Sequence, residues 1–231
     1  EADIYGLGVL LFELLAHHWE AAEEWPRAVE YLEKAGAQAL ESFANEECVS
    51  FYNGAITLDR KHNVGAAEER KGRWQRDMAE AQFRLGNISG ALQHGQVALV
   101  AMGRPLPRST VGTVFSLLGQ VFLRIAQGWL PTLFRVKEEA ERELRIAATR
   151  LQNRMTEAFI YEEDALRCLD SGLREINTSE PAGQSPELGR AYAVLTVVLG
   201  TVPMHRICRS WQRRAIKAAE YSDNPSAQAY V

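Results

Sequence analysis

Hydrophobic residues recur along this chain at the spacing of an α-helix. Near the start, Leu11, Leu14, Leu15 and Trp19 fall on one helical face, and the sustained alternation typical of a strand is hard to find anywhere. The pattern therefore predicts helices throughout. The predicted ranges are 8–22, 26–42, 46–58, 66–86, 88–102, 109–128, 137–160, 163–176, 187–200 and 204–220.

The connections between these helices are short and carry proline, glycine or asparagine. They are Trp25-Pro26, Gly86-Asn87, 103–107, 177–186 and 200–203. Helices joined by such turns pack antiparallel, and a lone hairpin cannot cover its own apolar stripe. We therefore predict an all-α fold, an α-solenoid of stacked antiparallel helical hairpins of the tetratricopeptide kind.

Small residues mark the expected helix crossings. Trp74, Met78 and Ala79 line one predicted helix, and Ala91 and Ala98 line the next, where they allow the two backbones to approach closely. This pair of helices is the clearest single unit of the predicted stack.

The same arrangement returns at intervals of 43 residues. This interval separates Cys48 from Ala91, and again Ala165 from Cys208, each of which begins a second helix. It exceeds the repeat of about 34 residues of a standard tetratricopeptide and overlaps the range of HEAT repeats. Either the helices are unusually long or the repeats are degenerate.

Composition excludes several classes of function. The 231 residues are 46% hydrophobic, enough for a continuous core, and 26 basic against 30 acidic residues give a formal net charge of -4. A dedicated nucleic-acid binder needs a basic footprint, which is missing. The apolar stretch 7–16 includes Glu13 and is too short to span a bilayer, so no membrane partner is expected.

Residues that could carry chemistry lack the spacing that chemistry requires. Three cysteines (Cys48, Cys168 and Cys208) have no C-x-x-C spacing, which indicates packed thiols in a reducing, cytoplasmic compartment. His17 and His18 do not form an H-E-x-x-H zinc motif. Gly6-Leu7-Gly8 lacks the third glycine of a dinucleotide site, and the carboxylate pairs Glu46-Glu47 and Glu162-Glu163 stand at helix starts. We expect no catalytic centre, metal or cofactor.

Four segments resemble one family. The residues at 14–56, 73–87, 98–110 and 185–206 are similar to the tetratricopeptide region of large bacterial signalling proteins, in which a class III adenylate or guanylate cyclase, or a Ser/Thr kinase, is joined to a STAND-type AAA ATPase. In that family the region follows the ATPase. The resemblance implies that it senses or scaffolds, while the chemistry lies upstream.

The first fifteen residues, EADIYGLGVLLFELL, resemble the protein-kinase helix whose buried Asp braces the catalytic loop, a role that Asp3 would match. The alternative is a plain first helix. No H-R-D loop, D-F-G or glycine-rich phosphate loop follows. We accordingly expect a possible remnant at 1–15 and a repeat domain at 16–231 that is truncated while a new segment, 226–231, begins.

The predicted binding surface is the concave wall formed by the first helix of each hairpin. If Ala79 takes the small position of its repeat, five residues face this groove, and Arg190 joins them from the last full hairpin. The five are Arg73, Arg76, Glu80, Phe83 and Arg84. Arginine can bind a carboxylate in bidentate fashion, so the set suits an acidic peptide or a partner helix. The alternative is a solvated charged face.

One less regular segment, 128–134, contains Pro131 and offers a further contact. Trp129 and Phe134 would form a satellite site if exposed, whereas Trp19, Trp25, Trp74 and Trp211 are better explained by packing.

The sequence as a whole indicates a cytoplasmic, non-catalytic protein-interaction module that docks a protein, a peptide or the upstream domains of its own polypeptide. The alternative is a fragment of an enzyme whose active site lies outside this chain. A helical repeat that binds nucleic acid or a small ligand is a third possibility, and the oligomeric state is not predicted.

Overall fold

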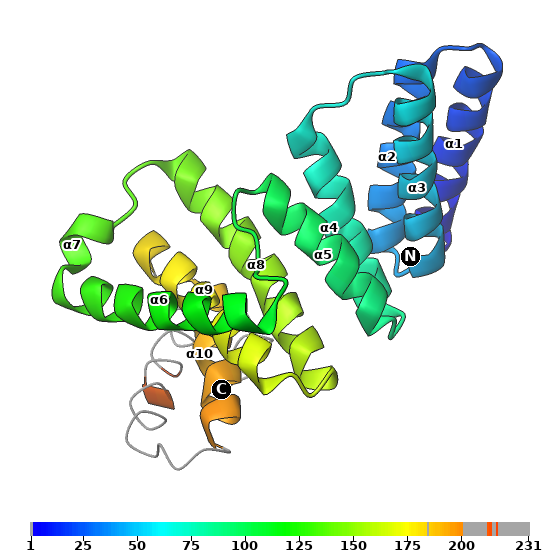
Figure 1. The fold of residues 1–231 in the computed structure, drawn as a ribbon. Coiled ribbons are helices and arrows are strands. Elements are labelled where there is room, and N and C mark those ends of the chain that lie inside the picture. The colour runs from blue at the N-terminus through cyan, green and yellow to red at the C-terminus, as the bar shows by residue number, and fades with distance from the viewer. Residues whose placement is uncertain (1, 184, 201–211, 214–215, 217–231) are drawn as a thin grey trace. The chain divides into compact units, whose positions relative to one another are not determined.

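The computed structural model describes residues 2–183, 185–200, 212–213 and 216, and within them every regular element is a helix (Figure 1). The elements are α1 (Ala2–Ala21), α2 (Trp25–Glu41), α3 (Asn45–His62), α4 (Glu68–Arg84), α5 (Ile88–Ala101), α6 (Thr110–Trp129), α7 (Pro131–Phe134), α8 (Glu139–Tyr161), α9 (Ala165–Ser179), the 3-10 helix η1 (Glu180–Ala182) and α10 (Pro186–Gly200). The all-α prediction is confirmed. The predicted helix 204–220, with Cys208 and Trp211, and the segment 226–231 lie outside the described residues, apart from 212–213 and 216.

The chain divides into two compact units, Glu1–Pro105 and Leu106–Val231. The division falls inside the connection 103–107. At the start of the chain, α1 is one continuous helix across residues 15 and 16 and packs against α2.

The first unit is a tetratricopeptide-like stack of helical hairpins. Each helix from α1 to α5 packs against the next, and α2 also contacts α4. Trp74, Tyr52 and Met78 are among the largest fully buried side chains, and the core that contains them extends to Val9 on α1. Stacking of neighbouring hairpins therefore buries one continuous core, as the sequence predicted.

Six of the described helices end in the same turn. The residues at 23, 43, 63, 86, 103 and 163 all have positive φ between 50° and 76°. In each turn the next N–H bonds to the carbonyl five residues before it, as from Asn87 to Gln82 at 2.9 Å and from Asp164 to Phe159 at 3.0 Å. Within each unit this closure reverses the chain, and the following helix packs back on the one before it, as in the pairs α1–α2, α2–α3, α4–α5 and α8–α9.

A small residue five positions after the turn is buried in the next helix. Ala28, Cys48, Ala91 and Cys168 hold this place and are at most 4% exposed. The 43-residue interval between Cys48 and Ala91 is thus a structural repeat. Ala165 begins α9, as expected, but it is exposed, because the turn at Glu163 places Cys168 in the crossing instead.

The second unit is organised around α9, which contacts α6, α8 and α10. Its α8–α9 pair is a hairpin of the same kind as those in the first unit, and α6 lies along the side of α9 (Figure 1). Gly172 is the closest crossing: a Cβ there would lie 2.7 Å from Leu195 of α10. Because α6 packs on α9, the position of α6 depends on α9.

Candidate functional site

Helix α4 carries five of the six predicted groove residues. Ala79 is 2% exposed, which places it in the interior as the prediction required. Arg73 projects from the same helix with 54% of its side chain exposed. Glu80 and Phe83 are partly buried.

Two arginines of α4 face one acidic residue of α2. Arg70 Nε donates to Glu33 Oε2 at 2.6 Å, and the Arg73 guanidinium lies 4.0 Å from the other oxygen of the same carboxylate. Two guanidinium groups of one helix thus converge on one carboxylate of its neighbour. We name the surface formed by Glu33, Arg70, Arg73, Arg76 and Arg84 the α2–α4 face.

Further along the α2–α4 face, Arg84 is firmly held. Its Nε donates to Glu80 at 3.0 Å, its Nη1 donates to the backbone oxygen of Leu40 at 2.8 Å, and its guanidinium lies 4.9 Å from the centre of the Phe43 ring. These contacts tie the end of α4 to the end of α2.

Arg76 is held by its neighbour in sequence. Its Nε donates to Asp77 Oδ1 at 2.9 Å, while the other oxygen of Asp77 accepts from the buried Tyr52 hydroxyl at 2.9 Å. Burial raises the pKa of Tyr52, with the nearby Asp77 acting in the same direction. Among the four arginines of the α2–α4 face, Arg73 has the most exposed side chain and the longest ion-pair distance.

Arg190 belongs to the second unit, on α10, so the described contacts do not join it to the α4 set. Its positive charge acts on Glu175 of α9, which is fully buried. Burial holds the pKa of Glu175 well above its usual value; the hydrogen bond from Asn153 Nδ2 at 3.1 Å and the charge of Arg190 act in the opposite direction, and Glu157 raises it further.

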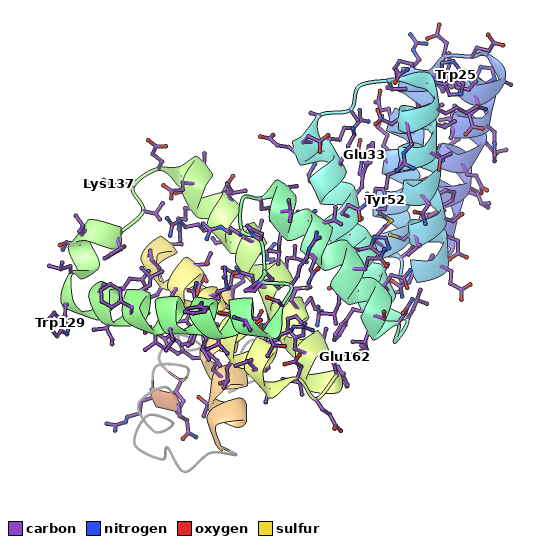
Figure 2. The ribbon with its side chains drawn as sticks, viewed as in Figure 1. Trp25, Glu33, Tyr52, Trp129, Lys137 and Glu162 are labelled. Atoms are coloured by element: carbon purple, nitrogen blue, oxygen red, sulfur yellow. The ribbon has the colours of Figure 1, made fainter. Side chains whose placement is uncertain are left out.

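A second surface, which the sequence interpretation missed, is the outer side of α6. Six apolar residues occur there at alternating spacings of four and three: Val111, Phe115, Leu118, Phe122, Ile125 and Trp129. The aromatic members are 71%, 73% and 82% exposed in chain order, and Trp129 projects from the end of the helix (Figure 2). We name these six residues the α6 seam.

The opposite side of α6 is mostly polar and is bonded to α9. Ser116 bonds to Asp170, and Arg174 joins both, donating to Asp170 at 3.0 Å and to Ser116 at 2.6 Å. The amide of Gln127 donates to the backbone oxygen of Asn177 at 3.0 Å. The helix therefore turns its polar side inward and its apolar side outward.

This orientation could not be found from α6 alone. An apolar stripe on a predicted helix ordinarily marks the buried side. The informative signal is on α9, where Asp170, Arg174 and Asn177 follow one helical face and need polar neighbours. Of the two residues of the predicted satellite contact, Trp129 is exposed and Phe134 is half-buried, so only Trp129 meets the stated condition.

Helix α6 is also long and apolar enough to cross a bilayer, the one helix among the described residues that meets this criterion. Its inner side contains Arg124, which forms an ion pair with Glu180. A transmembrane position would have to break this pair and the hydrogen bonds to α9.

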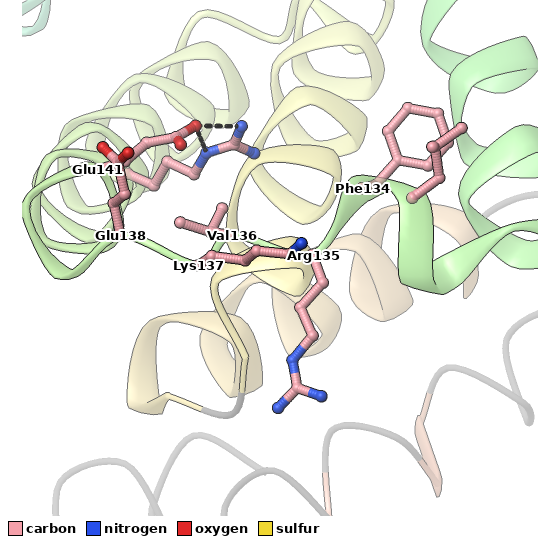
Figure 3. A pocket seen from close by; sticks show the side chains of 8 residues that line it. Phe134, Arg135, Val136, Lys137, Glu138 and Glu141 are labelled. Atoms are coloured by element: carbon pink, nitrogen blue, oxygen red, sulfur yellow. Dashed lines mark hydrogen bonds and ion pairs between the residues drawn. The ribbon is translucent and has the colours of Figure 1, made fainter.

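An open depression of about 370 Å³ lies where α7 leads into α8. Arg135 and Lys137 border it, and Arg145 donates two hydrogen bonds to Glu141 at its edge (Figure 3). The linker is fixed because Val136 N–H donates to Pro181 at 3.0 Å. Arg135 and Lys137 are exposed on the linker and Arg145 is paired with Glu141, so no buried group of the depression is placed to select a ligand.

The thiols in the described part of the chain are structural. Cys48 and Cys168 are buried, and burial raises the pKa of Cys48 to about 12 and that of Cys168 to about 11. Neither forms a nucleophilic thiolate at neutral pH. Among the residues that the structure describes, no three His, Cys, Asp or Glu side chains gather as metal ligands would.

Comparison with known proteins gives structural likenesses only. No protein-family model matches the chain, and no curated protein matches it. The crystal structure of BtubC (BKLC) from P. vanneervenii aligns with 97% of this chain and 93% of its own, at 14% identity and a TM-score of 0.44. The TPR2AB domain of yeast Sti1, in a complex with pHSP90, aligns with 99% of this chain and 95% of its own, at 15% identity and a TM-score of 0.30. Scores this low say nothing about the site or partner of this chain.

Proposed function

We propose that this chain is a non-catalytic protein-interaction module that binds a carboxylate-bearing protein segment on the α2–α4 face. The observation that carries the proposal is the convergence of Arg70 and Arg73 on the Glu33 carboxylate. Because Arg73 is more than half exposed and 4.0 Å from Glu33, its guanidinium can turn to a partner's carboxylate at little cost.

The other contacts of the face also suit a polypeptide ligand. Arg84 already binds a backbone carbonyl, that of Leu40, and the Phe43 ring beside it is exposed. An acidic peptide or helix could therefore place a carboxylate at Arg73 and apolar area near Phe43. Arg190 stays a separate candidate contact within the second unit.

The finer context follows from the resemblance to the cyclase- and kinase-linked ATPases. In that context the module is a cytoplasmic regulatory scaffold that docks a partner or the upstream domains of its own polypeptide. The alternative, an enzyme fragment, is supported if the reading frame upstream encodes a cyclase or kinase active site.

The test uses an array of fluorescein-labelled acidic peptides and measures binding by fluorescence anisotropy. We expect at least one peptide to bind, and Arg73→Glu to weaken it about tenfold or more through the lost and reversed charge. The matched control is Arg60→Glu, which changes an exposed arginine of α3. Equal affinities of the parent chain and of the Arg73→Glu, Arg76→Glu double variant would remove the α2–α4 face as the site.

A further inference from the structure

The α6 seam has the form of one half of a helix–helix interface. Its 4-3-4-3-4 spacing is the repeat by which two helices pack side by side at a shallow crossing angle. The aromatic residues Phe115, Phe122 and Trp129 alternate strictly with the aliphatic residues Val111, Leu118 and Ile125. No charged residue lies on the seam, because Arg124, the sole charge of α6, points inward to Glu180.

The helix cannot bury this side by rotating. Asp170, Arg174 and Asn177 hold its inner side through the contacts with Ser116, Gln120 and Gln127. Rotation would break these hydrogen bonds and would leave the side chain of Asn177, which is 5% exposed, without the partners that it has on α6. The apolar side must be covered from outside the unit.

We propose that the α6 seam pairs with the α6 seam of a second copy of this chain, antiparallel and about a two-fold axis level with Gln120. This places Val111 opposite Trp129 of the second copy, Phe115 opposite Ile125, and Leu118 opposite Phe122. Every layer then contains one aromatic and one aliphatic residue, so all layers have similar volume. A parallel pair would instead stack aromatic on aromatic and aliphatic on aliphatic.

Gly119 gives independent support for a close neighbour. It is exposed in the middle of α6, and a Cβ there would meet nothing within 4 Å. A glycine inside a helix destabilises it relative to alanine unless another backbone approaches. Gly112 and Ala126 stand seven residues on either side, so one whole flank of the seam is small. In the antiparallel pair this flank meets its own copy.

The area also fits a dimer. Together with Val114 and Val121, the seam exposes on the order of 800 Å², about what each partner contributes to a stable interface. Self-complementarity of size, the absence of charge and the matching area together favour a second copy over an unrelated partner. The proposal goes beyond the proposed function and uses a different surface.

The first experiment is sedimentation-velocity ultracentrifugation of the whole chain from 1 to 200 μM. We expect a monomer–dimer equilibrium, and Phe122→Glu should raise the dimer Kd at least about 100-fold because it buries a charge between two copies. Phe43→Glu is the matched control, since Phe43 is also 73% exposed but lies on the first unit. It should leave the dimer unchanged.

The second experiment tests the orientation by oxidative cross-linking in a Cys208→Ser background, where the remaining Cys48 and Cys168 are buried. Gly119→Cys, close to the axis, should form an intermolecular disulfide. Val111→Cys should not, because the two copies of residue 111 would be about 27 Å apart along the helix axis. A disulfide at 111 means a parallel pair and overturns the proposed orientation.

Three results overturn the proposal. One is a chain that stays monomeric to 200 μM, and another is a dimer that Phe122→Glu and Phe43→Glu affect equally. The third is a monomer whose Phe122 is needed for binding to vesicles of phosphatidylcholine and phosphatidylserine, which would make lipid the occupant. Circular dichroism of Phe122→Glu confirms that the fold is retained; because Phe122 is exposed, no loss of helix is expected.

Discussion

Glu175 is a carboxyl group in a place where the charged form is strongly disfavoured. It is fully buried between helices of the second unit, and one of its oxygens accepts a hydrogen bond from Asn153. Burial raises its pKa well above the 4.5 of the free side chain. The folded chain therefore keeps a proton that the unfolded chain releases.

This difference predicts how stability depends on pH. Below pH 4.5 both states hold the proton and Glu175 adds no dependence. Above it the folded state binds more protons, so the free energy of unfolding falls as pH rises, by up to about 1.4 kcal/mol per pH unit, until the folded group ionises. Glu175→Gln can still accept from Asn153 and removes this loss.

Urea unfolding between pH 4.5 and 8 measures the effect. We expect the variant to gain stability relative to the parent chain as pH increases, and the two to converge at acid pH. Glu162→Gln, an exposed change near the end of α8, is the control and should follow the parent curve. Parallel curves for Glu175→Gln and the parent would show that the buried group ionises normally.

Single residues also decide what could be read from the sequence. The small residues Cys48 and Ala91 were recognised because a close helix crossing needs a small side chain near the start of the second helix. For the α8–α9 hairpin the sequence interpretation chose Ala165, three residues before the true crossing residue Cys168. Two small residues lie near the start of this helix, and only the turn at Glu163 distinguishes them.

At the scale of helices, the recurring turn with a positive-φ residue lets the chain reverse and form helical hairpins. Gly86 and Gly103 adopt its positive φ freely, whereas Glu163 adopts φ 56° with a side chain, which is strained. Glu163→Gly should therefore stabilise the α8–α9 hairpin by about 0.5–1 kcal/mol. The reciprocal change, Gly86→Ala, should destabilise the α4–α5 hairpin by a similar amount.

Chemical denaturation of the two variants and the parent chain measures both changes in the free energy of unfolding. The far-UV circular dichroism spectrum confirms that the helical fold is kept. Glu162→Gly serves as the matched control: it adds a glycine one position away, where the backbone is in the right-handed helical region. Stabilisation by Glu162→Gly equal to that by Glu163→Gly would show that the gain does not come from the left-handed position.

Helices and turns were predictable because their signals are local. Predicted and observed boundaries differ by a few residues for most elements; α1 starts at residue 2 instead of 8, and α3 runs four residues further than expected, to His62. The direction in which α6 faces was not predictable, since it depends on α9 more than forty residues later. The same limit applies to the candidate site. Arg73 was identified on α4, but its pairing with Glu33 depends on how α2 and α4 stack.

At the scale of the whole molecule, the division into two units means that the connection between them is its most vulnerable segment. The chain passes from α5 through Gly103 to Ser109, the N-cap of α6, and Arg108 just before that cap is exposed. The carbonyl of Arg108 accepts from Arg167 at 3.2 Å, a contact at the surface that opens easily. Each unit has a core of its own, around Trp74 in the first and around Ile176 and Leu195 in the second.

Among the described residues, limited trypsin digestion should therefore cut first after Arg108, because an exposed connection opens at lower free energy than a packed helix. Arg135 and Lys137 are also exposed on a linker, but Val136 between them donates a hydrogen bond to the Pro181 carbonyl, so these two sites should be cut later. Arg76 and Arg84 lie within α4 and should resist, and the bond from Arg104 to Pro105 is a poor trypsin substrate. Mass spectrometry identifies the first cut.

The isolated fragment 1–108 should keep its helical circular dichroism, since its core is complete. Arg108→Gln removes the site and should delay any division of the chain. A first cut within α4, or a fragment 1–108 that loses its helices, would mean that the first unit needs the second in order to fold.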